Sequence, residues 1–311
     1  MKALRFTVFL FCILCFASCA SVKSDKIPEL IVRQERMLWE IRSENSSVFI
    51  VGTIHVGSEE IYPLDETILD LFDSATRIYA ELSTEDINNL SLSLQKMMLQ
   101  GMLENMGKPK LLSNLSIQET VLLNKILGAA NVQALNGFEP WVMKAAVEQQ
   151  LFSDAKIDPA KGLDLFFYKR AGTRKVLGLD DLQTQLDLLS FGTYDDQLYL
   201  LKETIKECQD LEDFQANLKK IMQAYVHDDR KELGTLVQSI ELLFPEDAPN
   251  DLYTRYLEAL LYTRNQDWAK KIIDVTAQPG ITFIFAGAGH FCGENNVFDI
   301  LKEKKLLRTS F

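Results

Sequence analysis

Short apolar runs alternate along the chain with longer stretches of helical periodicity. Runs rich in β-branched and aromatic residues, bounded by glycine or by polar turn residues, are typical of strands. Such runs predict strands at Met37–Arg42, Val48–Ile54, Thr76–Leu82, Lys175–Leu179 and from Thr282 onward, with a closing strand over Lys304–Phe311. We therefore expect an α/β (α+β) fold with a mixed sheet of about five or six strands.

Helical periodicity fills most of the chain between these runs. A helix is expected after Pro63, over Asp65–Ser74. A large helical section is expected over roughly 82–171 and 186–262, covering one side of the sheet. The pattern leaves open whether these helices form a separate cap.

The first residues predict an exported protein. A short basic start precedes an apolar run over Phe6–Ala17, which is too short to span a bilayer and is typical of a secretory signal. Small residues then precede Cys19, as at a bacterial lipoprotein cleavage site, so Cys19 is the predicted lipidation site. The alternative is an ordinary cleaved signal that ends near Ala17 or Ala20.

The chain is accordingly divided into three parts. They are a lipoprotein signal peptide over 1–18, a lipidated tether over 19–34 and one folded domain over 35–311. We expect the protein to cross the inner membrane and to be lipid-anchored to the cell envelope, at the outer or the inner membrane. The sequence does not indicate an oligomeric state.

Charge and cysteine content narrow the possible partners. The net charge of −11 argues against nucleic acid, which requires a basic face. Of five cysteines, only Cys208 and Cys292 lie beyond the N-terminal segment, so no disulfide framework is expected. Either one bridge between them or two buried free thiols fits this count.

Two of the three histidines occupy the same local setting. Gly52-x-x-His55 and Gly287-x-x-His290 each follow a predicted buried strand. Ligands of sheets with helical crossovers gather at the carboxyl ends of the strands, so we expect His55 and His290 to meet in space. The third histidine, His227, lies in a polar stretch and is expected at the surface.

A third strand end supplies a carboxylate, Glu81. Two imidazoles and one carboxylate form the ligand set of many hydrolytic zinc sites, and they also bind iron or manganese with open positions. The sequence thus predicts a divalent transition metal, namely Mn, Co, Zn or Fe. The alternative is two buried histidines bonded to backbone carbonyls, with Glu81 on a solvated edge.

An ordered set of motifs resembles the TraB/GumN family, which is related to the animal Tiki proteins. The resemblance spans Met37 to Phe311 and rests on Val51-Gly-Thr-Ile-His55-Val-Gly, Tyr79-Ala-Glu81-Leu, Gly162-Leu-Asp164, Gly178-Leu-Asp180 with Gln185, Arg264-Asn265 and Ala286-Gly-Ala-Gly-His290-Phe-Cys-Gly293. At one position the sequence departs from the family, which often has Leu-Glu where this chain has Leu179-Asp180.

The resemblance implies a function. Tiki relatives are described as membrane-tethered, metal-dependent proteases that use two Gly-x-x-His motifs and a glutamate. Carried over, His55 and His290 would be metal ligands, and Glu81 a ligand or the general base. Arg264 and Asn265 would bind the substrate carbonyl or orient a carboxylate ligand.

The leading hypothesis is therefore a metal-dependent hydrolase, a peptidase acting on a peptide or protein substrate in the envelope. The alternative is a non-catalytic envelope protein that binds signalling peptides or haem. Two interpretations also remain for Cys292, as a soft-metal ligand or as a small buried residue beside a glycine turn.

Overall fold

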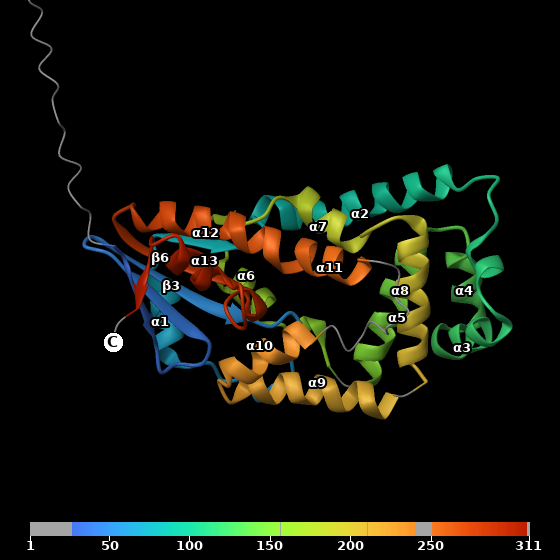
Figure 1. The fold of residues 1–311 in the computed structure, drawn as a ribbon, viewed down its shortest axis with the longest axis horizontal. Coiled ribbons are helices and arrows are strands. Elements are labelled where there is room, and N and C mark those ends of the chain that lie inside the picture. Colours follow the sequence, from blue (N-terminus) through green and yellow to red (C-terminus); the bar gives the residue numbers. More distant parts are fainter. Residues whose placement is uncertain (1–26, 156, 210, 240–250, 310–311) are drawn as a thin grey trace, which may run out of the picture.

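The computed structural model describes residues 27–155, 157–209, 211–239 and 251–309. Their strands form one mixed seven-stranded sheet in the order β5-β4-β6-β3-β2-β1-β7 (Figure 1). The signal peptide predicted over 1–18 and the lipidation site Cys19 lie outside the described residues. The strands are β1 (Glu29–Val32), β2 (Leu38–Arg42), β3 (Ser46–Thr53), β4 (Arg77–Ala80), β5 (Val176–Gly178), β6 (Gly280–Gly287) and β7 (Arg308–Thr309).

The predicted α/β class is confirmed, with three differences in detail. The sheet has seven strands where five or six were expected. One of them, β1, lies inside the segment 19–34 that was expected to be a tether, because Glu29–Val32 pairs with β2 along its whole length. Of the strand predicted over Lys304–Phe311, residues 304–309 are described, and among them only Arg308–Thr309 form a strand, since the chain leaves α13 (Val297–Glu303) through a turn at Lys305, where φ is positive.

The central strands are parallel and end at one edge of the sheet. β3, β6, β4 and β5 run in the same direction, and Thr53 pairs with Gly287 at the ends of β3 and β6. Ala80, the last residue of β4, pairs with Phe285 and with Gly178. The residues that follow these strands therefore emerge together, at the edge where such sheets bind ligands.

The helices carry most of the remaining chain. The expected helix over Asp65–Ser74 is present, with Asp65 as its N-cap. The α-helices are α1 (Glu66–Ser74), α2 (Thr84–Glu104), α3 (Ile117–Leu127), α4 (Ala129–Leu135), α5 (Pro140–Asp154), α6 (Leu163–Ala171), α7 (Leu182–Leu189), α8 (Tyr194–Glu207), α9 (Leu211–Val226), α10 (Arg230–Gln238), α11 (Leu252–Leu257), α12 (Thr263–Thr276) and α13 (Val297–Glu303).

Helices cover both faces of the sheet. On one face, Phe72 of α1 and Phe167 of α6 pack against Phe283, with ring centroids 5.2 and 5.3 Å away. On the opposite face, Trp39 of β2 lies 5.6 Å from Phe298 of α13. Side chains alternate between the faces of a strand, so the large apolar residues of the sheet are divided between two layers of core.

The sequence led us to expect that the helical section covers one side of the sheet, but only part of it, including α6, packs on the sheet. The section extends beyond the carboxyl ends of the strands (Figure 1) and buries a second core of its own. Helical periodicity shows which face of a helix is buried but not whether a sheet or another helix covers it. The buried residues of this second core are Leu111, Leu123, Val132, Met143, Val147, Leu151, Leu201, Ile205 and Cys208.

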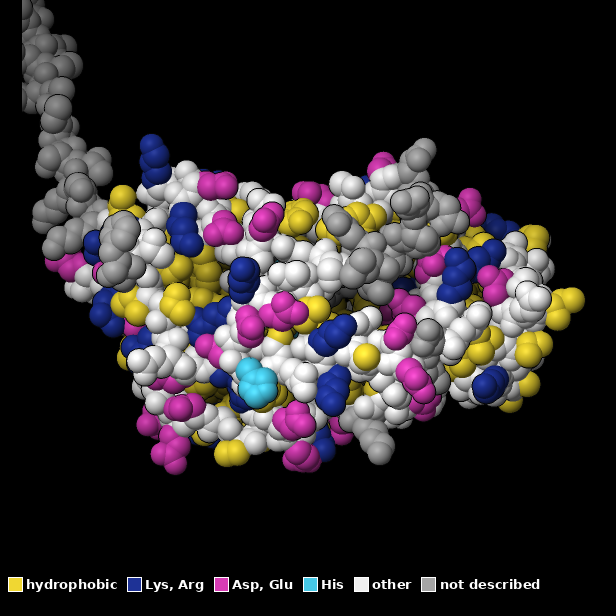
Figure 2. Space-filling view, turned by 60° about the horizontal axis from the view of Figure 1, so that its bottom comes forward, with side chains coloured by type: hydrophobic (Ala, Val, Ile, Leu, Met, Phe, Trp, Pro, Cys, Tyr) yellow, Lys and Arg dark blue, Asp and Glu magenta, His cyan; other side chains and the backbone are white. Residues whose placement is uncertain are grey.

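The surface and the thiols complete the description. Acidic and basic side chains are interspersed on the face in Figure 2.

Within the described residues, no helix combines the length and the apolar character that a membrane crossing needs. Cys208 and Cys292 are buried free thiols, so the second of the two alternatives for them holds.

One buried bond ties the helical section to the strand that carries the first histidine motif. The hydroxyl of Tyr225 in α9 donates to the carbonyl of Gly52, 2.7 Å away. We predict that Tyr225→Phe lowers the free energy of unfolding by about 1–2 kcal/mol, because a buried acceptor loses a donor. Urea unfolding measures this change. In the matched control, Tyr194→Phe, the lost bond is solvent-exposed, and a change below about 0.5 kcal/mol is expected. Equal effects of the two substitutions would contradict the prediction.

Candidate functional site

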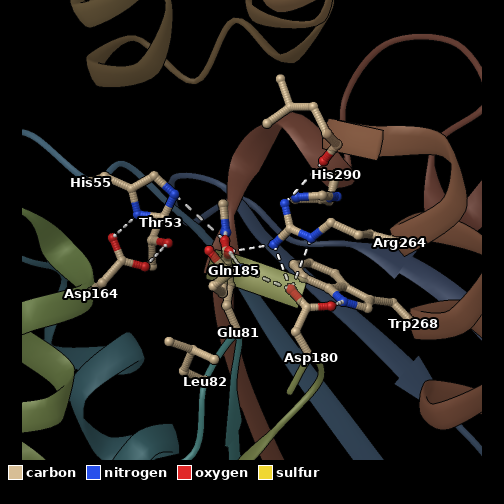
Figure 3. A network of polar contacts seen from close by, with 12 residues as sticks. Thr53, His55, Glu81, Leu82, Asp164, Asp180, Gln185, Arg264, Trp268 and His290 are labelled. Atoms are coloured by element: carbon tan, nitrogen blue, oxygen red, sulfur yellow. Dashed lines mark hydrogen bonds and ion pairs between the residues drawn. The ribbon is translucent and has the colours of Figure 1, made fainter. Parts of the chain in front are cut away.

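Three parallel strands deliver three of the predicted site residues to one place, and α12 supplies the other two, Arg264 and Asn265. His55 follows β3, Glu81 follows β4, and His290 lies in the 3-10 turn Ala288–His290 after β6. Figure 3 shows their side chains at the strand ends, with Asp164 of α6, Gln185 of α7 and Arg264 of α12 around them. The sequence-based expectation that the two histidines meet at this edge is thus matched by their position.

The loop that carries His55 is held by the segment that leads into α6. Gly57 and Asp158 exchange two backbone hydrogen bonds of 3.1 Å, and the N–H of Leu163 donates to the carbonyl of Ile54. A Cβ on Gly57 would lie 2.3 Å from the carbonyl oxygen of Lys161, so only glycine allows this approach. The contact brings the start of α6, with Asp164, beside His55.

His55 lies between two carboxylates. Its Nδ1 is 3.0 Å from Asp164 Oδ2, and its Nε2 is 3.6 Å from Glu81 Oε1. Thr53 donates its hydroxyl to the other oxygen of Asp164, which fixes that carboxylate. The negative charge of Asp164, supported by that of Glu81, raises the pKa of His55 well above its ordinary value, although 65% of the side chain is exposed to water.

Glu81 is a largely buried carboxylate at the centre of the site. Its Oε1 accepts the N–H of Gly287 at 2.8 Å, and its Oε2 accepts from Arg264 Nη2 at 2.5 Å. Burial alone would raise the pKa of Glu81, but the positive charges of His55 and Arg264 outweigh burial and lower the pKa to about 2. Glu81 is therefore ionised at neutral pH.

Arg264 bridges two buried carboxylates. Its guanidinium contacts Glu81 and also Asp180, with Nε 2.8 Å from Asp180 Oδ2. Gln185 and Trp268 donate to the same aspartate at 2.9 and 2.6 Å. Since most of the guanidinium is engaged in this way, Arg264 orients the carboxylate of Glu81 and has little left to offer a substrate carbonyl.

His290 is buried and fixed by an amide. Its Nδ1 is 2.6 Å from Asn265 Oδ1, and the amide nitrogen of Asn265 donates to the carbonyl of Asn295. An amide oxygen can only accept, so Nδ1 carries the proton and Nε2 keeps its lone pair. The ring lies 4.0 Å from that of Trp268. Burial, together with the charge of Arg264, lowers the pKa of His290 to about 3, so the ring is neutral at neutral pH.

Gly287 provides the space in which these groups meet. A Cβ at this position would lie 3.0 Å from Glu81 Oε1, 3.6 Å from His55 Nε2 and 3.6 Å from His290 Cδ2. Because both distances start from the same point, His55 Nε2 and His290 Cδ2 are no more than twice 3.6 Å apart. The glycine of the second motif is thus needed because three functional side chains converge on its α-carbon.

Four further residues complete the site without having been predicted as site residues. They hold the predicted ones: Asp164 holds His55, while Asp180, Gln185 and Trp268 surround Arg264. Three of them, Asp164, Asp180 and Gln185, stand in motifs that carry the family resemblance, which was the available signal. Trp268 had no such signal, because a tryptophan in an amphipathic helix is typical of the core.

The two remaining candidates lie outside this cluster. His227 is exposed at the end of α9, as expected. Cys292 lies in the hydrophobic core, and burial raises the pKa of its thiol to about 12, which fits the interpretation as a small buried residue.

The hydrogen bonds of the two imidazoles suit metal binding, but the spacing of the candidate ligands does not. Metal-bound histidines usually donate their second ring nitrogen to a fixed acceptor, and Asp164 and Asn265 are placed to serve in that way. Glu81 Oε1 accepts one N–H and retains a second lone pair. However, within the described ranges, no three His, Cys, Asp or Glu side chains are already arranged to hold an ion. A metal would therefore require these side chains to move closer together.

Comparison with known proteins identifies relatives but no characterised function. The family model for TraB/PrgY/gumN matches residues 37–307. A protein of Treponema pallidum (strain Nichols), described as uncharacterized, is 41% identical over 310 residues, which covers 98% of this chain and 93% of the relative. No solved structure matches the chain.

The buried ion network predicts a large effect of Arg264 on stability. Arg264→Met would leave Glu81 and Asp180 without their cation, and we expect unfolding to become easier by about 3–5 kcal/mol. Chemical denaturation measures the change. Arg170→Met, which breaks a surface pair with Asp73, serves as the control and is expected to cost about 0–1 kcal/mol. A loss for Arg264→Met no greater than for this control would show that the network does not stabilise the fold.

The two site histidines are predicted to differ in charge at neutral pH, with one ring positive and the other neutral. In metal-free protein, imidazole NMR signals assigned with single-histidine variants should show His55 protonated and His290 neutral at pH 7. Since the folded pKa values of His290 and Glu81, about 3 and about 2, lie below their ordinary values of 6.5 and 4.5, both groups favour folding less as the pH falls through those ranges. Protonation of His290 between pH 5 and 7 would refute this assignment.

Proposed function

The chain belongs to the TraB/PrgY/gumN family, and we propose that it is a metal-dependent hydrolase. The proposed site consists of His55, His290 and Glu81, and the proposed substrates are peptides or proteins of the bacterial cell envelope. The peptidase assignment is supported by the resemblance to Tiki-like proteins rather than by the geometry alone.

The observation that carries this proposal is the way both histidines are held. Each ring has its Nδ1 against a fixed oxygen, Asp164 in one case and Asn265 in the other. Each Nε2 is therefore the nitrogen available to a ligand, and the Nε2 of His55 faces the ionised Glu81. Histidines that served only to fill the core would not need two matched acceptors beside a buried carboxylate.

The site residues fall into two groups, metal ligands and positioning residues. His55, His290 and Glu81 Oε1 would hold a divalent transition metal, namely Mn, Co, Zn or Fe. When bound, such a metal supplies a Lewis acid that polarises a carbonyl and lowers the pKa of water. Arg264 aligns Glu81 and, together with the positive charge of His55, keeps it ionised. Asn265 keeps the proton of His290 on Nδ1. Arg264 and Asn265 thus act as positioning residues.

Envelope anchoring is the second part of the proposal. It is supported by the basic start, the apolar run over Phe6–Ala17 and the small residues before Cys19. Lipidation at Cys19 would leave a short connection to β1, which begins at Glu29.

Metal content tests the site directly. We predict that the chain from Ser21, which lacks the signal peptide and the lipidation site, holds about one equivalent of a transition metal by mass spectrometry when purified without chelating resin. The double variant His55→Ala/His290→Ala should hold less than about a tenth of this amount, since two imidazole ligands are lost. In the double variant, cleavage of a peptide library in the presence of that metal should fall by a similar factor.

The third histidine provides the matched control. His227→Ala removes an exposed imidazole far along the chain from both motifs and should leave metal content and cleavage unchanged. A wild-type protein that is isolated without metal and that binds none of Mn, Co, Zn or Fe on titration would overturn the metal assignment. That result would favour the envelope binding protein over the hydrolase.

A further inference from the structure

A cavity adjoins the candidate site on the side of Arg264. Its volume is about 470 Å³, and it lies between α7, α11 and the segment that joins α11 to α12. Figure 1 shows α7 and α11 between the sheet and the helices α3, α4, α5 and α8 that form the second core. The volume is within the range of small-molecule sites. None of the roles proposed above uses this cavity.

The cavity and the site share two walls. Arg264 lines the cavity, and its Nη2 contacts Glu81. Thr184 lines it as well, and the next residue, Gln185, lies 3.4 Å from the same carboxylate. One arginine side chain therefore separates the cavity from the carboxylate of the site. A substrate whose reacting bond lies at Glu81 would place a neighbouring group in this space.

An irregular helix forms the wall that carries Arg264. Residues Glu258–Tyr262 form a π-helical turn between α11 and α12. In this turn the carbonyl of Leu260 accepts from Arg264 Nη1 at 2.9 Å, and Ala259 lies on the cavity wall. Turns of this kind are rare and are frequent at functional sites. Here the turn fixes Arg264 and also shapes the cavity.

The lining indicates the chemistry of the occupant. Half-buried Leu188, Phe191 and Ala259 supply apolar surface. Exposed Asp187, Arg255 and Glu258 stand at the rim. Arg255 is paired with Asp196 and Asp251, whereas Asp187 and Glu258 form no ion pair with any described residue. Apolar walls favour a hydrophobic group, and two carboxylates at the entrance disfavour an acidic one.

We propose that this cavity is a specificity subsite that binds one large apolar side chain of the substrate, of leucine to phenylalanine size, next to the reacting bond. The inference rests on the proposed hydrolase function for the meaning of that bond. The cavity itself binds such a group whether or not the bond is cleaved, so binding can be tested separately from catalysis.

The test uses two small probes that are observed by fluorine NMR on the chain from Ser21. One is N-acetyl-4-trifluoromethylphenylalanine methylamide, and the other is N-acetyl-trifluoroalanine methylamide, which has the same backbone without the large side chain. The aromatic probe should bind at least about tenfold more tightly than the small one, which is the range of discrimination that apolar pockets achieve.

Two variants place the binding in the cavity. Ala259→Phe fills it, and Leu188→Ser removes apolar surface without adding bulk, so misfolding of one variant leaves the other informative. Each should weaken binding of the aromatic probe at least about tenfold. Ala130→Phe, an equal enlargement on the exposed surface of α4, should leave the affinity unchanged.

The outcomes separate the two proposals. Equal affinity for both probes, or unchanged affinity in folded Ala259→Phe and Leu188→Ser, would overturn the subsite whatever the activity of the protein. Tight binding of the aromatic probe that both variants abolish would support the subsite even in a protein that proves to hold no metal and to cleave no peptide. Only the hydrolase would then be lost.

Discussion

The buried arginine between two carboxylates is the interaction on which the rest of the site depends. Arg264 contacts Glu81 and Asp180, and all three side chains are almost fully removed from water. Burying one of these charges alone would cost several kcal/mol, so each member is tolerated only because the others are present. Without the arginine, the glutamate that faces His55 would lose one of the two main positive charges that lower its pKa.

Around this ion network, each histidine is held by a side chain from a different helix. Asp164 at the start of α6 fixes His55, while Asn265 of α12 fixes His290. The strands bring the reactive groups close together, and side chains of the helices determine the protonation state of each imidazole. One ring is consequently positive and exposed, and the other is neutral and buried, although both belong to the same sequence motif.

The meeting of the strand ends could be predicted from the sequence for a physical reason. Parallel strands buried on both faces read as continuous apolar runs, and the glycines after them mark where functional groups emerge. The residues that orient these groups could not be predicted in this way. Nothing local in α6 or α12 tells which strand end Asp164 or Arg264 faces, and only the family resemblance singled out these positions. β1 was missed because four residues beside a polar segment carry little periodicity, and its pairing with β2 is a tertiary choice.

The direction of β1 has a consequence for a protein attached at its N-terminus. β1 is antiparallel to β2, which is antiparallel to β3, so β1 runs in the same direction as β3. Glu29 therefore enters the sheet at the edge opposite His55, and the eight residues of β3 separate the two edges by about 26 Å. A chain fixed to a surface through its first residues would hold the edge that carries His55 on the side of the sheet away from that surface. Substrates would then be taken from the surrounding fluid rather than from the surface beneath.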